Sequence, residues 1–209
     1  MNNIEKEQII KLIHREVIPA IGCTEPIALA LASAKACSLF RPEKPSRINV
    51  QVSANILKNA MGVGIPGTGM VGLPIAIALG ALIGKSAYGL EVLKDLTPEG
   101  LERGKALVEN RAISIHLKEQ VDKLYIEVVC RAGNSRATAV ISHEHTRFVY
   151  LEKDGAVFMN SLANPGGEAN GEEEEDLRLS FSMVYDFAMN MPLDEIRFIM
   201  ETARLNEAA

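Results

Sequence analysis

Residues 61–84 carry no charged side chain, and this run restricts the fold more than any other feature of the sequence. A membrane-spanning helix needs about 20 consecutive apolar residues, so the run has nearly the required length. Its first half is broken at Gly62, Gly64, Pro66, Gly67, Gly69, Gly72 and Pro74. We therefore expect a glycine-rich loop followed by an apolar helix of about ten residues, which is too short to cross a bilayer.

The composition is that of a globular protein. The 209 residues are 47% hydrophobic and 23% charged, which excludes disorder for most of the chain. The formal net charge of -5 at pH 7 argues against nucleic acid or an anionic membrane as the main partner. Three cysteines are an odd number with no close pair, so no disulfide framework is expected. The charged N-terminus lacks the apolar core of a signal peptide, and we expect a cytoplasmic protein.

Helical and strand periodicities both occur along the chain, which predicts an α+β fold. An Ala-rich helical layer (1–40 and 74–110, with the C-terminal helices) is expected to pack on a mostly antiparallel β-sheet (48–54 and 112–154). The segment 26–40 is apolar almost all round, as in a helix enclosed by neighbours. The predicted helices are 4–18, 26–40, the second half of 61–84, 98–110, 175–190 and 193–206. After the strand at 48–54, four antiparallel strands are predicted at 113–117, 124–130, 138–140 and 148–151.

The segment 163–176 is rich in Gly and Glu and has no apolar anchor, so we predict a mobile acidic loop there. This loop separates two parts of the chain. The first is an α+β domain, 1–162, which contains both motifs described next. The second comprises the C-terminal helices, 177–209.

The first motif is GCTEP around Cys23. Pro26 suits the first turn of a helix and Thr24 can cap it, so Cys23 is expected where free backbone N–H groups and the helix dipole favour an anion. A thiol with a lowered pKa can serve there as a metal or cluster ligand or as a nucleophile. A small residue in a tight turn is an equally good interpretation. Cys37 and Cys130 occupy core positions, where a neutral thiol simply packs.

The second motif is the glycine-rich segment that follows Lys58 and Asn59, the only strongly polar side chains next to it. Small residues let the backbone approach a ligand and offer N–H groups to a carboxylate or phosphate. The P-loop and dinucleotide-binding patterns are both missing. A loop whose glycines only allow close packing is an equally good interpretation. The triplet His143-Glu144-His145 lacks the spacing of a zinc-binding helix and is predicted to be a solvated turn.

Together the motifs resemble those of the iron-sulfur L-serine dehydratase alpha-chain and L-cysteine desulfidase-like family, which includes the UPF0597 proteins. The resemblance rests on GCTEP with its Ala-rich helix, on KNAMGVGIPGT from Lys58 to Thr68, and on 185–206. It covers nearly the whole chain. It implies a 4Fe-4S lyase without pyridoxal phosphate, which eliminates water or hydrogen sulfide from a small L-amino acid to give pyruvate and ammonia. Serine, cysteine and other substrates stay open.

The resemblance also implies roles for individual residues. Cys23 matches the first of three cluster ligands in the family. Lys58 is the candidate for proton transfer, because a lysine withdrawn from water loses its proton more readily, although it could equally hold the substrate carboxylate as a plain cation. Thr24 and Glu25 are expected to shape the ligand loop. The substrate-binding candidates are Thr24, Glu25, Asn59, Gly67 and Thr68.

The chain departs from the family in length. Family members are about twice as long, and their other two cluster cysteines lie in the C-terminal half; Cys37 and Cys130 do not match these positions. We therefore expect an N-terminal portion that holds no cluster and is inactive alone, and that needs the C-terminal half in cis or trans. An exposed apolar surface for that half, and a homodimer of this chain, are also expected. The alternative is a non-catalytic small-anion-binding or assembly domain that kept the fold.

Overall fold

The computed structural model describes residues 2–20, 22–40, 44–162 and 178–208. It contains two compact units, Ala20–Gly167 and Met1–Pro19 with Glu168–Ala209. The first helix is thus grouped with the C-terminal helices, a grouping that the sequence analysis did not make. The acidic loop predicted at 163–176 lies outside the described residues.

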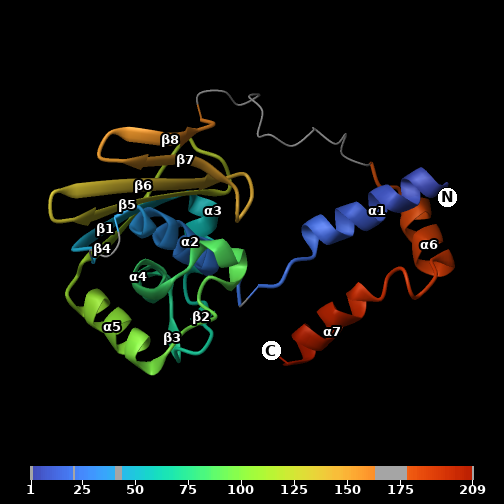
Figure 1. Ribbon diagram of the computed structural model, residues 1–209, viewed down its shortest axis with the longest axis horizontal. Helices are drawn as coiled ribbons and strands as arrows, with labels where there is room; N and C mark the ends of the chain where they lie inside the picture. Colours follow the sequence, from blue (N-terminus) through green and yellow to red (C-terminus); the bar gives the residue numbers. More distant parts are fainter. Residues whose placement is uncertain (1, 21, 41–43, 163–177, 209) are drawn as a thin grey trace. The chain divides into compact units, whose positions relative to one another are not determined.

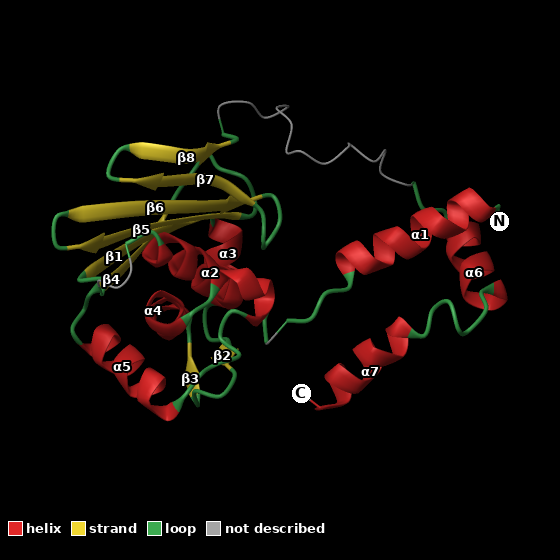
Figure 2. Ribbon diagram, in the orientation of Figure 1, coloured by secondary structure: helices red, strands yellow, loops and turns green. Residues whose placement is uncertain are grey.

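The larger unit is built on a six-stranded sheet with the order β4-β1-β5-β6-β7-β8 (Figure 2). From β1 to β8 in this order each strand pairs antiparallel with the next, whereas β4 pairs parallel with β1. The α+β fold with a mostly antiparallel sheet is therefore confirmed. The strands are β1 Arg47–Val52, β4 Ile113–Leu117, β5 Tyr125–Ala132, β6 Ser135–Ser142, β7 Phe148–Lys153 and β8 Ala156–Asn160.

Two strands differ from the sequence prediction. The predicted antiparallel strand at 113–117 is instead parallel, with Ile48 opposite Ile113 at the start of the ladder. Its direction follows from the connection, because the helices between β1 and β4 carry the chain back across the sheet before β4 begins. Strand β8 was not predicted. Its five residues are all exposed, so no alternation of buried and exposed side chains marks them as a strand.

Helices cover one face of this sheet in successive layers (Figure 1). Helix α2 packs on β5 and β6, α4 packs on α2, and α5 packs on α4. As the composition predicts, nearly all of α2 is buried. The two helices α2 and α4 approach closely at Gly80, where a Cβ atom would lie 2.6 Å from the Cα of Ala30. The helices of this unit are α2 Thr24–Ser38, α3 Ala54–Ala60, α4 Leu73–Ile83, the 3₁₀ helix η1 Ser86–Glu91 and α5 Pro98–Glu109.

The uncharged run forms a small β-hairpin and then helix α4. Strands β2 (Gly64–Ile65) and β3 (Met70–Val71) pair antiparallel. Among the described residues, no helix has the length and apolar character that a membrane span requires.

The smaller unit consists of α1 (Asn3–Glu16), α6 (Phe181–Asn190) and α7 (Phe198–Ala208). Its small core joins Ile9 of α1 to Phe187 and Met191. Lys6 pairs with Glu195 at 2.7 Å, and the rings of His14 and Phe198 stack with centroids 4.0 Å apart. Helices are therefore confirmed in these segments, but both C-terminal helices begin later than predicted. Ser180 caps α6 by accepting from the N–H of Met183, and 193–197 form turns before α7 begins at Phe198.

Candidate functional site

Cys23 is the N-cap residue of α2, with an extended backbone, and it is exposed to solvent. From the sequence, Thr24 was predicted to cap this helix. Thr24 is instead the first helical residue, and the cap makes no side-chain hydrogen bond. The carbonyl of Cys23 still accepts a hydrogen bond from the N–H of Ile27 at 3.4 Å. The thiol is thus presented at the start of a buried helix.

The carboxylate of Glu25 is the centre of the polar contacts around this thiol. The Sγ of Cys23 donates to Oε2 of Glu25 at 3.2 Å, and the hydroxyl of Thr24 donates to the same oxygen at 3.3 Å. The amide of Asn59, from the last turn of α3, donates to Oε1 at 3.2 Å. Glu25 therefore joins the start of α2 to the end of α3, and it brings three of the predicted site residues to one place.

The protonation state of Cys23 differs from the prediction. Partial burial, the hydrogen bond to Glu25 and the negative charge of Glu25 raise the pKa of Cys23 above its ordinary value. The backbone N–H groups at the helix start act in the opposite direction but are outweighed. The predicted lowered pKa is therefore wrong for this chain, because the thiol is partly buried and also lies beside the carboxylate of Glu25.

Glu25 carries the negative charge of the site. Partial burial alone would raise the pKa of Glu25, but hydrogen bonds from Cys23, from its own backbone N–H and from Asn59 lower it, as does the nearby charge of His145. The net effect is a lowered pKa. The proton of this pair therefore resides on the Cys23 sulfur, and the charge resides on Glu25.

The glycine-rich hairpin lies against the Cys23 turn. Gly22 has a φ of +85°, and a Cβ atom there would be 2.7 Å from Cγ of Pro66. Only glycine fits this position, because its φ is left-handed and Pro66 fills the space. The two motifs of the sequence thus form one region of the structure.

Thr68 has a structural role within the hairpin. Its buried hydroxyl donates to the carbonyl of Ile65 at 2.6 Å and accepts from the N–H of Met70 at 2.9 Å. Its own N–H also donates to Ile65, at 3.2 Å. The groups of Thr68 that were predicted to bind substrate are therefore engaged in the turn, whereas Gly67 is exposed.

Lys58 lies on α3, a helix that the sequence analysis did not predict. Ser53 caps this helix through the N–H of Ile56. Lys58 is exposed, one residue before Asn59. The withdrawal from water that would favour proton transfer is therefore not provided by the described residues.

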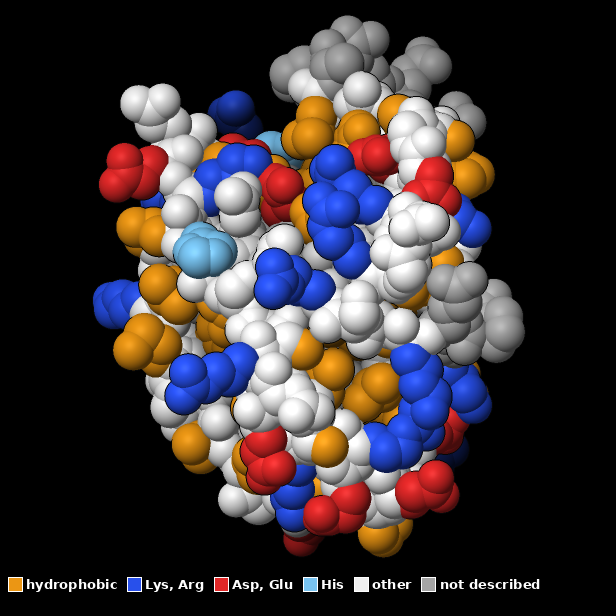
Figure 3. Space-filling view, turned by 90° about the vertical axis from the view of Figure 1, so that its left-hand side faces the viewer, with side chains coloured by type: hydrophobic (Ala, Val, Ile, Leu, Met, Phe, Trp, Pro, Cys, Tyr) orange, Lys and Arg blue, Asp and Glu red, His pale blue; other side chains and the backbone are white. Residues whose placement is uncertain are grey.

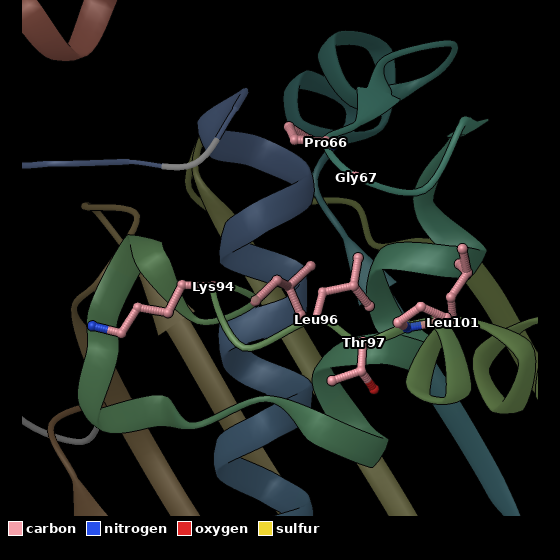
Figure 4. Close-up of a pocket in the computed structure, with 8 residues that line it drawn as sticks. Pro66, Gly67, Lys94, Leu96, Thr97 and Leu101 are labelled. Atoms are coloured by element: carbon pink, nitrogen blue, oxygen red, sulfur yellow. The ribbon is translucent and has the colours of Figure 1, made fainter. Parts of the chain in front are cut away.

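A pocket of about 390 Å³ lies next to the hairpin, and Figure 4 shows residues that line it. The amino group of Lys94 points away from the other labelled side chains and lies 3.8 Å from the centre of the Tyr88 ring. The hydroxyl of Thr97 caps α5 by accepting from the N–H of Gly100. The pocket is mainly apolar, and its lining residues are Pro66, Gly67, Leu93, Lys94, Leu96, Thr97, Pro98 and Leu101.

His145 is a site residue that the sequence analysis missed. The triplet 143–145 does lie in a turn, after β6, as predicted. His143 has a φ of +71° and lies 3.6 Å from Asp122. His145, however, is half-buried and close enough to Glu25 to affect its pKa. No local pattern could reveal this, because only the packing of α2 on β6 brings the two residues near each other.

The cysteines of this chain do not fit a 4Fe-4S cluster, which needs three or four thiolates. Cys37 and Cys130 are fully buried, and their sulfur atoms are 3.0 Å apart. Cys37 lies near the far end of α2, about 20 Å from Cys23 at 1.5 Å per residue. Within the described ranges, no three His, Cys, Asp or Glu residues are grouped so that they could hold a metal ion. Any cluster at Cys23 must therefore take its other ligands from elsewhere.

The fold and the site define a class of protein: an α+β domain that presents an exposed thiol at a helix start, beside a carboxylate and a glycine-rich hairpin. The chain is 67% identical to a UPF0597 protein of Parabacteroides distasonis over 210 aligned positions, which cover 100% of this chain and 48% of that protein. It is 59% identical to a UPF0597 protein of Bacteroides thetaiotaomicron, with 98% and 47% covered. The identity to a UPF0597 protein of Oleidesulfovibrio alaskensis is 44%, with the same shares covered. No family model and no solved structure matches the chain.

The chain belongs to the UPF0597 family. It spans about half the length of the curated relatives that it matches.

Proposed function

We propose that this chain is the N-terminal portion of a lyase of the L-serine dehydratase or L-cysteine desulfidase type, which forms pyruvate and ammonia from a small L-amino acid. In this proposal Cys23 provides one thiolate to a 4Fe-4S cluster, and the other half of the protein provides the remaining ligands. Such a cluster supplies a Lewis acid for the leaving group. The observation that carries the proposal is the exposed Cys23, which lies next to Glu25 and to the glycine-rich hairpin.

In this proposal each polar residue of the region has a task. A thiol must lose its proton to bind a metal ion. Oε2 of Glu25, 3.2 Å from Cys23 Sγ, is placed to receive that proton, and Asn59 holds Oε1 in position. Lys58 offers an exposed positive charge one residue away from Asn59, which suits the carboxylate of an amino acid. The backbone at Gly67, in the turn of the glycine-rich hairpin, is exposed.

Iron content tests the ligand role. We expect Cys23→Ala in the full-length protein, reconstituted under anaerobic conditions, to lose iron and the absorbance near 400 nm that is typical of such clusters. Cys37→Ala is the matched control, because Cys37 lies on the same helix but is buried. Iron content equal to that of the wild type in Cys23→Ala would refute the ligand role.

Turnover tests the substrate role of Lys58. We expect Lys58→Ala to reduce kcat/KM by about tenfold, which corresponds to the loss of one charged contact of about 1.4 kcal/mol. Lys105→Ala is the control, because Lys105 pairs with Glu102 on α5 and does not line the pocket. Full turnover in Lys58→Ala would leave the lysine a structural role only. A rise in melting temperature with small amino acids, in a protein that never binds iron, would favour the non-catalytic binding domain.

A further inference from the structure

The glycine-rich hairpin presents an uncharged surface next to Cys23. From Asn59 to Gly84 the sequence has no charged residue. On this hairpin Met61 is 66% exposed and Val71 is 65% exposed. The face of the molecule in Figure 3 differs, because Lys and Arg side chains are spread over it among acidic and apolar ones. An uncharged surface with large exposed apolar side chains is typical of an interface.

Gly64 independently supports the interpretation that the hairpin surface is an interface. A Cβ atom at Gly64 would meet no atom within 4 Å, and its φ is not left-handed. Neither the backbone nor the packing of the described residues therefore requires a glycine here, in contrast to Gly22. A strand glycine without such a reason suits a place where another backbone approaches closely.

The apolar pocket adjoins this hairpin through Pro66 and Gly67. Pro66 also contacts Gly22, the residue before Cys23. In Figure 4 the loop that carries Pro66 and Gly67 lies above Leu96 and Leu101, which also line the pocket. The pocket can therefore accept an apolar side chain from a partner that also reaches Cys23.

We propose that the hairpin 61–72 and the pocket beside it form the docking surface for the polypeptide that makes up the other half of the UPF0597 relatives. Those relatives match this chain over its whole length and have about as many residues again. The identification of this polypeptide as the partner rests on the proposed function. Cys23 needs thiolate partners, while Cys37 and Cys130 are buried and contact each other. The partner must therefore approach Cys23, and this hairpin is the apolar surface that adjoins its turn.

Co-expression tests the proposal. The 209-residue chain carries an affinity tag. It is produced together with the half of the Parabacteroides distasonis UPF0597 protein that the match does not cover. The amount of that half recovered per tagged chain is measured without added iron. We expect near-stoichiometric recovery with the wild type and at least a tenfold loss with Val71→Lys. Val157→Lys on β8 is the matched control, because Val157 is also an exposed strand valine, at 52%. It is expected to leave recovery unchanged.

A second variant separates docking from folding. Gly64→Val adds a side chain where the chain itself has open space, so thermal unfolding is expected to stay the same while recovery falls at least tenfold. No recovery with the wild type, or full recovery with both Val71→Lys and Gly64→Val, would overturn the proposal. A wild-type chain that dimerises through the hairpin, and becomes a monomer in Val71→Lys, would also overturn it in favour of a second copy. Cys23→Ala is expected to dock normally, so loss of iron without loss of docking distinguishes this surface from the cluster role.

Discussion

The two ends of helix α2 place the same residue type in opposite surroundings. At the N-terminal end, Cys23 is exposed and donates a hydrogen bond to Glu25. Near the C-terminal end, Cys37 is buried, 3.0 Å from the sulfur of Cys130. In both places the pKa of a thiol is raised, but the main causes differ: partial burial and then a carboxylate for Cys23, and a neighbouring thiol followed by full burial for Cys130.

This difference shows that position on a helix does not determine how a cysteine behaves. The dipole and free N–H groups at the start of α2 would favour a thiolate, yet partial burial, together with the carboxylate of Glu25, outweighs their effect on the pKa of Cys23. Because Cys23 is exposed, a metal ion that binds its sulfur can displace the thiol proton. At the buried end, the neighbouring thiol and full burial disfavour the ionised form of Cys130, so this end is suited to packing.

The largest expected effect comes from Gly80→Ala, which separates α2 from α4 and so disturbs the packing that supports both ends. A Cβ atom at Gly80 would lie 2.6 Å from Cα of Ala30 and closer still to its carbonyl oxygen. Because backbone atoms cannot rotate away, we expect a loss of about 3 kcal/mol in the free energy of unfolding, measured with urea. Gly64→Ala is the control and should change stability by less than about 0.5 kcal/mol. An unchanged midpoint in Gly80→Ala would contradict the close approach of the two helices.

The second prediction compares the two ends directly through Cys130→Ser and Cys23→Ser. Serine at position 130 places a hydroxyl in a fully buried apolar site beside Cys37, at a cost of about 2 kcal/mol in the free energy of unfolding. Serine at position 23 stays exposed and should cost less than about 0.5 kcal/mol. Equal losses in the free energy of unfolding for the two variants would contradict the difference in burial between Cys23 and Cys130.

The third prediction concerns alkaline pH. The hydrogen bond to Cys37, burial and the charge interaction with Cys37 raise the pKa of Cys130 well above 9.0. In the unfolded chain the thiol ionises near that ordinary value, so the unfolded state gains stability as the pH rises above it. The contribution of Cys130 is therefore complete below pH 9 and is lost as the pH rises through its folded pKa. Between pH 9 and pH 10 we expect a loss of about 1 kcal/mol that is absent in Cys130→Ala. Parallel pH profiles for the two proteins would contradict this.

Much of the fold could be predicted because its signals are local. The all-round apolar character of 26–40 gave a buried helix, and Thr97 before Pro98 gave the start of α5, where its hydroxyl caps Gly100. The core positions of Cys37 and Cys130 followed from the same periodicities. These local patterns do not indicate which strands pair with each other, so the parallel pairing of β4 with β1 was not predicted.

The site was only partly predictable because its main contacts join distant parts of the chain. Both motifs were found, and Gly22 against Pro66 brings them together. Glu25 was assigned to shaping the loop and to binding substrate, but its hydrogen bond to Asn59 depends on helix α3, which was not predicted. The influence of His145 on Glu25 likewise depends on tertiary packing. The pKa of Cys23 was predicted in the wrong direction, because the sequence shows neither the partial burial of the thiol nor its hydrogen bond to Glu25.

The smallest expected effect is on the rate at which iodoacetamide modifies the folded protein at pH 8. This rate reports on Cys23, at the exposed end of α2. Cys23 should react first, giving a single adduct by mass spectrometry, because the other two thiols are buried. Glu25→Gln removes the carboxylate that raises the pKa of Cys23, so more thiolate is present at this pH and the reaction should be about threefold faster. Partial burial, the larger cause of the raised pKa, remains in the variant and limits the gain.

The matched control for this measurement is Glu99→Gln, which removes an acidic residue from the first turn of α5 and lies near no cysteine along the chain. Its rate of modification should equal that of the wild type. Across a pH series, the rate of Glu25→Gln should reach its half-maximum at a lower pH than the rate of the wild type. If the two curves coincide, or if Glu25→Gln reacts more slowly, the helix start rather than Glu25 controls the thiol. In that case Cys23 would differ from the buried pair only in its exposure.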